Sequence, residues 1–259
     1  MRTVISKDGT PIAFNQSGEG TPIILVVGAF NDHSTGAPLA APLSEHFTVF
    51  NYDRRGRGAS GDTVPYVIER EIEDIEALIT EAGGQAAVFG YSSGAVLALK
   101  AKAAGLAISK LALYEPPFLV DEGLPQLAQG ISARLTKLLS EGLRGEAVEL
   151  YQTEMVGIPA EIVAQLRHAP FRPALETIAH TLVYDAALMG DMEVLAQQLP
   201  SITVPTLVIS GGNSQVRIRS AAQTLADALP HAQHRSLEGQ THDIIPEVLA
   251  PVLETFFAD

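Results

Sequence analysis

Ser92 is the residue of this chain whose surroundings best suit covalent chemistry. It is the centre of residues 90–94, which read Gly-Tyr-Ser-Ser-Gly and connect an apolar strand pattern to a helix rich in small residues. At such a turn the serine is held in a strained backbone conformation that projects its oxygen from the end of the strand. The spacing predicts Ser92 as a nucleophile and the backbone N–H of Ser93 as a donor to an oxyanion. The alternative is a Gly- and Ser-rich turn without chemistry.

A serine nucleophile needs a base, and His242 is the histidine best placed to be one. It follows the strand pattern at 234–237 and precedes the terminal helix. Because parallel strands end at one edge of their sheet, this loop can bring His242 over Ser92. Asp243 beside it would suit a metal site, but the sequence offers no second set of His and Asp ligands. We therefore expect neither a metal nor a cofactor.

The loop at 27–30 is the expected source of a second oxyanion donor. It follows an early apolar run, and Gly28 would let the backbone approach the nucleophile closely. The backbone N–H of Ala29 is the predicted donor, and a plain strand-to-helix turn is the alternative. The side chains of Phe30 and Tyr91 are the expected substrate contacts.

Apolar runs alternate with helical patterns, which is typical of a mostly parallel sheet with helices on both faces. Strands are expected at residues 3–6, 11–16, 23–27, 48–52, 86–91, 110–114, 206–210 and 234–237. Helices are expected at 66–82, 94–104, 146–155, 160–168, 174–189 and 217–229, with a helical stripe at Leu127, Ile131, Leu135 and Leu138 and a terminal helix. Strand patterns disappear between 118 and 200. We therefore predict an α/β core at 1–117 and 201–259, with 118–200 as a helical cap.

Composition narrows the function classes. The 259 residues are 46% hydrophobic and include no cysteine, so disulfides, zinc thiolates and a cysteine nucleophile are excluded. The formal net charge of −13 disfavours nucleic acid and anionic membrane surfaces as partners and leaves a small molecule as the expected one. No run approaches the length of about 18 apolar residues that a membrane span needs, and no signal peptide is evident at the start. A cytoplasmic location is the default expectation.

Taken in chain order, residues 27–29, 52–60, 90–94 and 239–242 resemble the α/β-hydrolase superfamily, in particular its serine esterase and cofactor-free haloperoxidase branches. The resemblance spans the chain except the insertion, which corresponds to the superfamily's variable cap. It implies the α/β-hydrolase sheet and a triad without a cofactor. Members that cleave carbon–halogen bonds or epoxides use Asp in place of Ser92, and halide sites commonly use Trp, which this chain lacks. Those activities are not expected.

Two positions depart from the superfamily's pattern. Val27 stands where a histidine often precedes the oxyanion-loop glycine, and Ser214 stands where the catalytic Asp is usually found. Some members, certain haloalkane dehalogenases among them, carry the acid at the end of the strand after the nucleophile. Glu115 has that place here, so it is the predicted partner of His242. The alternative is that Glu115 caps the Pro-Pro turn that follows it or binds a backbone amide of the cap.

These inferences predict a carboxylesterase-like serine hydrolase. Ser92 would attack an ester, lactone or related acyl bond of a small, largely apolar substrate, and His242 would transfer the proton. Water would then release the acyl group from the enzyme. The second hypothesis, motivated by Ser214, is a small-molecule binding protein on the same fold that turns over weakly or not at all.

Overall fold

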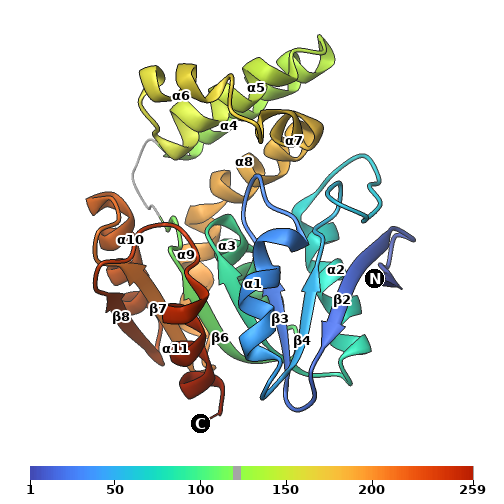
Figure 1. Cartoon of the computed structure of the whole chain (residues 1–259), viewed down its shortest axis with the longest axis vertical. Helices are drawn as coiled ribbons and strands as arrows, with labels where there is room; N and C mark the ends of the chain where they lie inside the picture. Colours follow the sequence, from blue (N-terminus) through green and yellow to red (C-terminus); the bar gives the residue numbers. More distant parts are fainter. Residues whose placement is uncertain (119–123, 259) are drawn as a thin grey trace.

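Eight strands form one sheet in the computed structural model, which describes residues 1–118 and 124–258, with the strand order β1-β2-β4-β3-β5-β6-β7-β8 (Figure 1). The strands are β1 (Arg2–Ile5), β2 (Pro11–Ser17), β3 (Pro22–Val26), β4 (Thr48–Tyr52), β5 (Ala86–Tyr91), β6 (Ile108–Tyr114), β7 (Thr206–Gly211) and β8 (Ala232–Leu237). β2 pairs antiparallel with β1 and β4, and every other pairing is parallel. The predicted mostly parallel sheet is confirmed.

Helices cover both faces of the sheet because successive side chains of a strand point to opposite faces. In β3, Ile24 and Val26 pack in one apolar cluster with α2 (Ile68–Glu81), α3 (Ser93–Ala103), α9 (Met192–Gln198) and α10 (Val216–Ala228). Ile23 and Leu25 pack in the other cluster, with α1 (His33–Leu43) and α11 (Pro246–Ala258). The continuous apolar run of this strand is therefore buried on both faces of the sheet, as expected of a strand covered on both sides.

Helix α1 was not predicted from the sequence. Its capping signal is present, since Asp32 Oδ1 accepts from the backbone N–H of Ser34 at 2.8 Å. Pro38 and Pro42 lie inside the helix, however, and prolines ordinarily argue against a helical interior. Because of these two prolines the segment did not read as a helix, although α1 buries Leu39 and Leu43 against the sheet.

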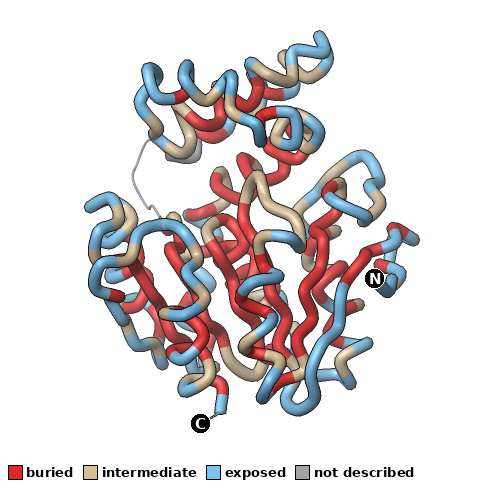
Figure 2. Tube along the Cα trace, in the orientation of Figure 1, coloured by how far each residue is buried: buried red, intermediate tan, exposed pale blue. Residues whose placement is uncertain are grey.

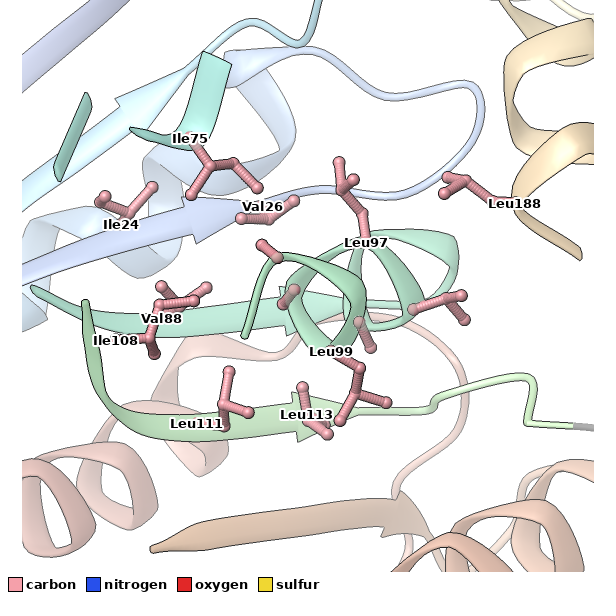
Figure 3. Close-up of a cluster of buried hydrophobic side chains, with 14 of the residues drawn as sticks. Ile24, Val26, Ile75, Val88, Leu97, Leu99, Ile108, Leu111, Leu113 and Leu188 are labelled. Atoms are coloured by element: carbon pink, nitrogen blue, oxygen red, sulfur yellow. The ribbon is translucent and has the colours of Figure 1, made fainter. Parts of the chain in front are cut away.

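Helix α3 lies at the centre of the molecule, directly after the predicted nucleophile. All of its residues from Ser93 to Ala101 are buried. Figure 3 shows Leu97 and Leu99 of α3 among side chains of the central strands, including Val26 and Leu113. A close-packed core of this kind fixes the helix and the turn that precedes it. The central strands are buried along their length, whereas the edge strands β1 and β8 are largely exposed (Figure 2).

Helical segments alone connect β6 to β7 in the described part of residues 118–200; residues 119–123 lie outside the described part. They are α4 (Leu124–Ser140), α5 (Arg144–Leu150), the π-helix η1 (Tyr151–Val156), α6 (Ala160–Leu166), α7 (Arg172–Thr177), η2 (Ala179–Thr181), α8 (Leu182–Gly190), α9 and η3 (Leu199–Ser201). Helices α4 to α7 stand above the carboxyl ends of the strands (Figure 1). We retain 118–200 as a proposed cap, attached through Leu188, Met192 and Leu195, which pack in the core cluster of α3.

Two expectations for this segment were wrong in detail. Residues 146–155 are divided between α5 and η1, and 174–189 is divided among α7, η2 and α8 rather than forming one helix. Thr177, Ile178 and Thr181 are β-branched and weaken the second pattern at the break. The predicted helical stripe is confirmed, since its four residues lie on α4; Ile131 and Leu135 are buried, whereas Leu127 is 45% exposed. No helix within residues 1–118 and 124–258 has both the length and the apolar character needed to cross a membrane.

Candidate active site

One cavity of about 210 Å³ lies where the ends of β3, β5 and β6 meet η1, α8 and α10. Six residues singled out from the sequence line it: Ala29, Phe30, Tyr91, Ser92, Ser93 and His242. Glu115 does not line the cavity, but its carboxylate contacts Nδ1 of His242, which does. Segments more than two hundred residues apart in the chain therefore meet at a single site, as parallel strand ends at one sheet edge allow.

Ser92 occupies a sharp turn between β5 and α3. Its φ of 55° and ψ of −127° lie in a region that side-chain-bearing residues rarely adopt. The flanking glycines explain how the turn fits: a Cβ on Gly90 would come within 2.5 Å of Ala95 Cα, and one on Gly94 within 2.2 Å of Val26 O. The backbone N–H of Ser92 donates to Tyr114 O at 3.0 Å, which ties the turn to the neighbouring strand. The strained elbow expected from the Gly-x-Ser-x-Gly spacing is therefore present.

The side chains of His242 and Glu115 are within hydrogen-bond distance at the edge of the cavity. His242 Nδ1 lies 3.2 Å from Glu115 Oε2, and the Glu115 side chain is fully buried. The other carboxylate oxygen accepts from the backbone N–H of Gly211 at 2.6 Å. The carboxylate thus bonds to Gly211 and His242, not to the Pro-Pro turn considered as the alternative. Glu115 also has a positive φ of 53°, so the backbone is turned at the position that presents the acid.

Two tyrosines hold the histidine loop. The Tyr114 hydroxyl donates to Thr241 O at 2.6 Å and also lies 3.1 Å from Asp243 O. It therefore contacts the backbone on both sides of His242. The ring of Tyr91 lies 5.1 Å from the His242 ring, centroid to centroid. Burial raises the pKa of the Tyr91 and Tyr114 hydroxyls above their usual range, so both hydroxyls stay protonated.

Ser214 supplies no carboxylate at the position where the superfamily usually has its acid. Its hydroxyl oxygen is buried and has no hydrogen-bond partner among the described residues. The loop that carries it is joined to the histidine loop, because the N–H of Asn213 donates to Gln240 O at 2.8 Å. β6 and β7 are neighbours in the sheet, so Glu115 reaches the histidine from the adjacent strand end.

Of the two predicted oxyanion donors, the backbone N–H of Ala29 already makes a hydrogen bond within the protein. The backbone N–H of Ala29 donates to Ser93 Oγ at 2.9 Å, and Ser93 Oγ in turn donates to Asp185 Oδ1 at 2.7 Å. The backbone N–H of Ser93 is the first in α3 and therefore has no acceptor within the helix. Phe30, the next residue of the loop, has a positive φ of 64°. The predicted role of Ala29 stays a prediction, and the Phe30 N–H is a second candidate.

Asp185 of α8 is the centre of a buried polar network that was not predicted from the sequence. Its carboxylate accepts from Arg54 at 2.9 Å and from Arg57 at 2.6 Å, and all three side chains are fully buried. Arg57 also donates to Gly28 O at 2.6 Å, and Glu71 pairs with Arg54 through both oxygens. The network thus joins the proposed cap to the loop at residues 27–30. The arginine-rich segment was a visible signal, but the sequence could not identify its acidic partner.

We expect Asp185→Asn to lower the free energy of unfolding by about 3–5 kcal/mol, because two buried guanidinium groups lose their carboxylate partner. Urea unfolding at pH 7 measures this, with the exposed Glu161→Gln as control.

Burial would raise the pKa of Asp185, but Arg57 and Arg54 hold it below its ordinary value of 3.8. Asp185 therefore stabilises the fold above that pH, and the contribution is lost as the pH falls through the lowered pKa. A loss below about 1 kcal/mol at pH 7 would contradict this assignment.

Asp32, His33 and Asp53 form the group of side chains in the described residues that could hold a metal ion, with potential ligand atoms within 4.8 Å of one another. Asp53 already accepts from the backbone N–H and from Nδ1 of His33, each at 2.8 Å, and from the N–H of Ala59 at 2.8 Å. A Cβ on Gly58 would also clash with its carboxylate. These hydrogen bonds show that Asp53 holds its own loop in place, which accounts for the carboxylate without a metal ion.

Residues 23–253 match the model of a family described as the alpha/beta hydrolase family. An alpha/beta hydrolase from Sphaerobacter thermophilus, known from its crystal structure, is 54% identical, with a TM-score of 0.92 over 99% of this chain and 100% of its own. The enol-lactonase from Burkholderia xenovorans shares the fold at 23% identity, with a TM-score of 0.75 over 100% of both chains. In sequence the chain is similar to 2-(acetamidomethylene)succinate hydrolase from Mesorhizobium japonicum, at 25% identity over 93% of this chain and 89% of that protein.

Proposed function

Because the chain belongs to the alpha/beta hydrolase family, we propose that it is a carboxylesterase-like serine hydrolase that cleaves an ester, lactone or related acyl bond. One observation carries the proposal. Glu115 contacts His242 Nδ1 at 3.2 Å, and His242 lines the same cavity as Ser92, which has the strained backbone of a nucleophile elbow.

The proposed mechanism follows from these contacts. The Glu115 carboxylate accepts a hydrogen bond from the Nδ1–H of His242, which keeps the proton on Nδ1 and leaves Nε2 free to take the proton of Ser92. Ser92 attacks the acyl carbon, and the N–H of Ser93, with that of Ala29 or Phe30, stabilises the oxyanion. His242 then returns the proton to the leaving group. Water, activated by the same histidine, releases the acyl group from Ser92.

The cavity supports a small, mostly apolar and uncharged substrate. Its volume of about 210 Å³ is small for a ligand site, and apolar side chains form most of its wall. They include Phe30, Leu127, Tyr151, Met155, Ile158 and Met189. We propose Phe30 and Tyr91, which line the cavity, as substrate contacts. The names of the two relatives above, a lactonase and a hydrolase of an acetamido compound, support acyl bonds as the target.

The competing proposal is a binding protein that retains the cavity without turnover. Ser214 motivated it, because a triad that lacks its acid is weak. The contact between Glu115 and His242 favours the enzyme instead, since it gives the histidine an acid from the neighbouring strand.

Stopped-flow hydrolysis of p-nitrophenyl acetate distinguishes the two. We expect a rapid release of about one p-nitrophenol per chain before a slower steady state, because a second step must free the acyl group from Ser92. Ser92→Ala is expected to abolish both phases, whereas Ser220→Ala, which alters an exposed serine, is expected to retain them. Folded wild-type protein that releases no p-nitrophenol, here and across a panel of longer esters and lactones, would support the binding protein.

A further inference from the structure

The loop at residues 27–31 (the 27–31 loop) lies directly against the nucleophile. A Cβ on Gly28 would come within 2.9 Å of the Cβ of Ser92. Ala29, Phe30 and Asn31 line the cavity that Ser92 also lines. An oxyanion formed by attack of Ser92 would therefore lie beside the backbone of this loop. A misplacement of about 1 Å in a group that meets the reacting atoms can cost about 100-fold in rate, so the contacts that hold this loop bear on the proposed reaction.

Two buried arginines take part in holding the carbonyl groups of the 27–31 loop. Arg57 donates to Gly28 O at 2.6 Å and to Asn31 O at 3.4 Å. The side chains of Arg57 and Arg54 are fully buried, and both pair with the Asp185 carboxylate of α8, which is also fully buried. Buried charges that are paired in this way resist displacement, because moving one away leaves its partner uncompensated. The carbonyl groups of the loop are therefore held through a network that includes a residue of the proposed cap.

The Ser93 hydroxyl extends this network to a backbone N–H of the loop. Its oxygen accepts from the N–H of Ala29 at 2.9 Å, and its single proton is donated to Asp185 Oδ1 at 2.7 Å. Ser93 is 3% exposed, so water has little access to these two bonds. Because the Ala29 N–H is engaged, the Phe30 N–H, which has no acceptor within residues 1–118 and 124–258, is favoured as the loop's donor to an oxyanion.

We propose that Ser93 is a positioning residue through its hydroxyl, which holds the 27–31 loop where a backbone N–H of that loop meets the oxyanion. The inference rests on the serine hydrolase function proposed above and adds to it a side chain that acts through its neighbour. Ser93 then has two roles, because its own backbone N–H meets the oxyanion and its hydroxyl fixes the second donor. The oxyanion exists only after attack by Ser92, so the hydroxyl is expected to affect kcat rather than substrate binding.

The kinetic test uses Ser93→Ala, which keeps the backbone N–H and removes the hydroxyl. We expect kcat on p-nitrophenyl butyrate to fall by about 10- to 100-fold. KM is expected to stay within about 2-fold, because acylation and deacylation both pass through an oxyanion and are slowed alike. Butylboronic acid, which forms a tetrahedral adduct with a nucleophilic serine, is expected to bind about 10-fold more weakly, whereas butyramide is expected to bind unchanged. Ser210→Ala removes another buried hydroxyl, 3.0 Å from His234 Nε2, and is expected to keep wild-type values.

Hydrogen exchange separates this proposal from the proposed function, because it does not depend on turnover. In Ser93→Ala, the peptide that contains residues 27–31 is expected to exchange its amide hydrogens at least about 10-fold faster than in the wild-type protein or in Ser210→Ala. Wild-type kcat or a higher kcat in Ser93→Ala would overturn the role of the hydroxyl and leave the hydrolase intact. Unchanged exchange, or equal weakening of butylboronic acid and butyramide, would also overturn it. Faster exchange in a protein whose wild type hydrolyses no ester would contradict only the hydrolase.

Discussion

Replacing either Ser92 or His242 with alanine is expected to lower kcat on a p-nitrophenyl ester by about 10⁶-fold, the loss typical of removing the nucleophile or base of a serine hydrolase. Neither residue contributes much to the core, since Ser92 lies at a turn and the His242 side chain is 45% exposed. Urea unfolding should therefore show wild-type-like folding for His242→Ala. The double variant is expected to lose little more than either single variant, because the two side chains act as one unit.

Matched controls separate this effect from general damage to the molecule. His168→Ala and Ser220→Ala change exposed residues of the same types and are expected to keep wild-type turnover. Losses in Ser92→Ala and His242→Ala that multiply in the double variant would show that the residues act independently. That result would contradict a shared proton-transfer step.

Glu115→Gln is expected to lower kcat by about 10⁴-fold, the effect of giving the histidine the wrong tautomer. The glutamine oxygen can still accept from the N–H of Gly211, so the backbone contact that the carboxylate makes is retained. Its amide N–H would face His242 Nδ1, which must then accept a hydrogen bond and leave the proton on Nε2. A histidine in that form cannot take the proton of Ser92. Steady-state kinetics with circular dichroism on the same samples measures the effect.

A second substitution shows whether the acid itself is what Glu115 supplies. Ser214→Asp, introduced into the Glu115→Gln protein, restores a carboxylate at the superfamily's usual position on the loop after β7. We expect it to recover at least about 10-fold of the lost kcat, because that loop is hydrogen-bonded to the histidine loop at Gln240. Wild-type-like turnover of Glu115→Gln alone would remove Glu115 from the mechanism.

The sheet could be predicted from the sequence because its strands are short apolar runs bounded by turn residues. The expected ranges 48–52 and 86–91 agree with β4 and β5. The elbow at Ser92 was predictable for a different reason. Its flanking glycines are required by the close backbone contacts of a strand-to-helix turn of this kind. Glu115 could be placed at a strand end from the sequence, but its distance from His242 could not.

The proposed cap was harder to predict because its local patterns are ambiguous. Apolar periodicity cannot distinguish the α-helix α5 from the π-helix η1 that continues it, so the π-helical turn had no sequence signal. Asp185 is a single acid in a helical pattern, and its partners Arg54 and Arg57 lie about 130 residues earlier in the chain. Long-range ion pairs of this kind leave no mark in a single sequence.

Mass spectrometry after reaction with a fluorophosphonate probe tests the pairing of Ser92 with His242 most directly, because the probe reacts with serines that a neighbouring base activates. We predict rapid phosphonylation confined to the peptide that contains Ser92, and loss of that labelling in His242→Ala protein that remains folded. Labelling at another serine, or labelling of Ser92 that persists without His242, would contradict the account.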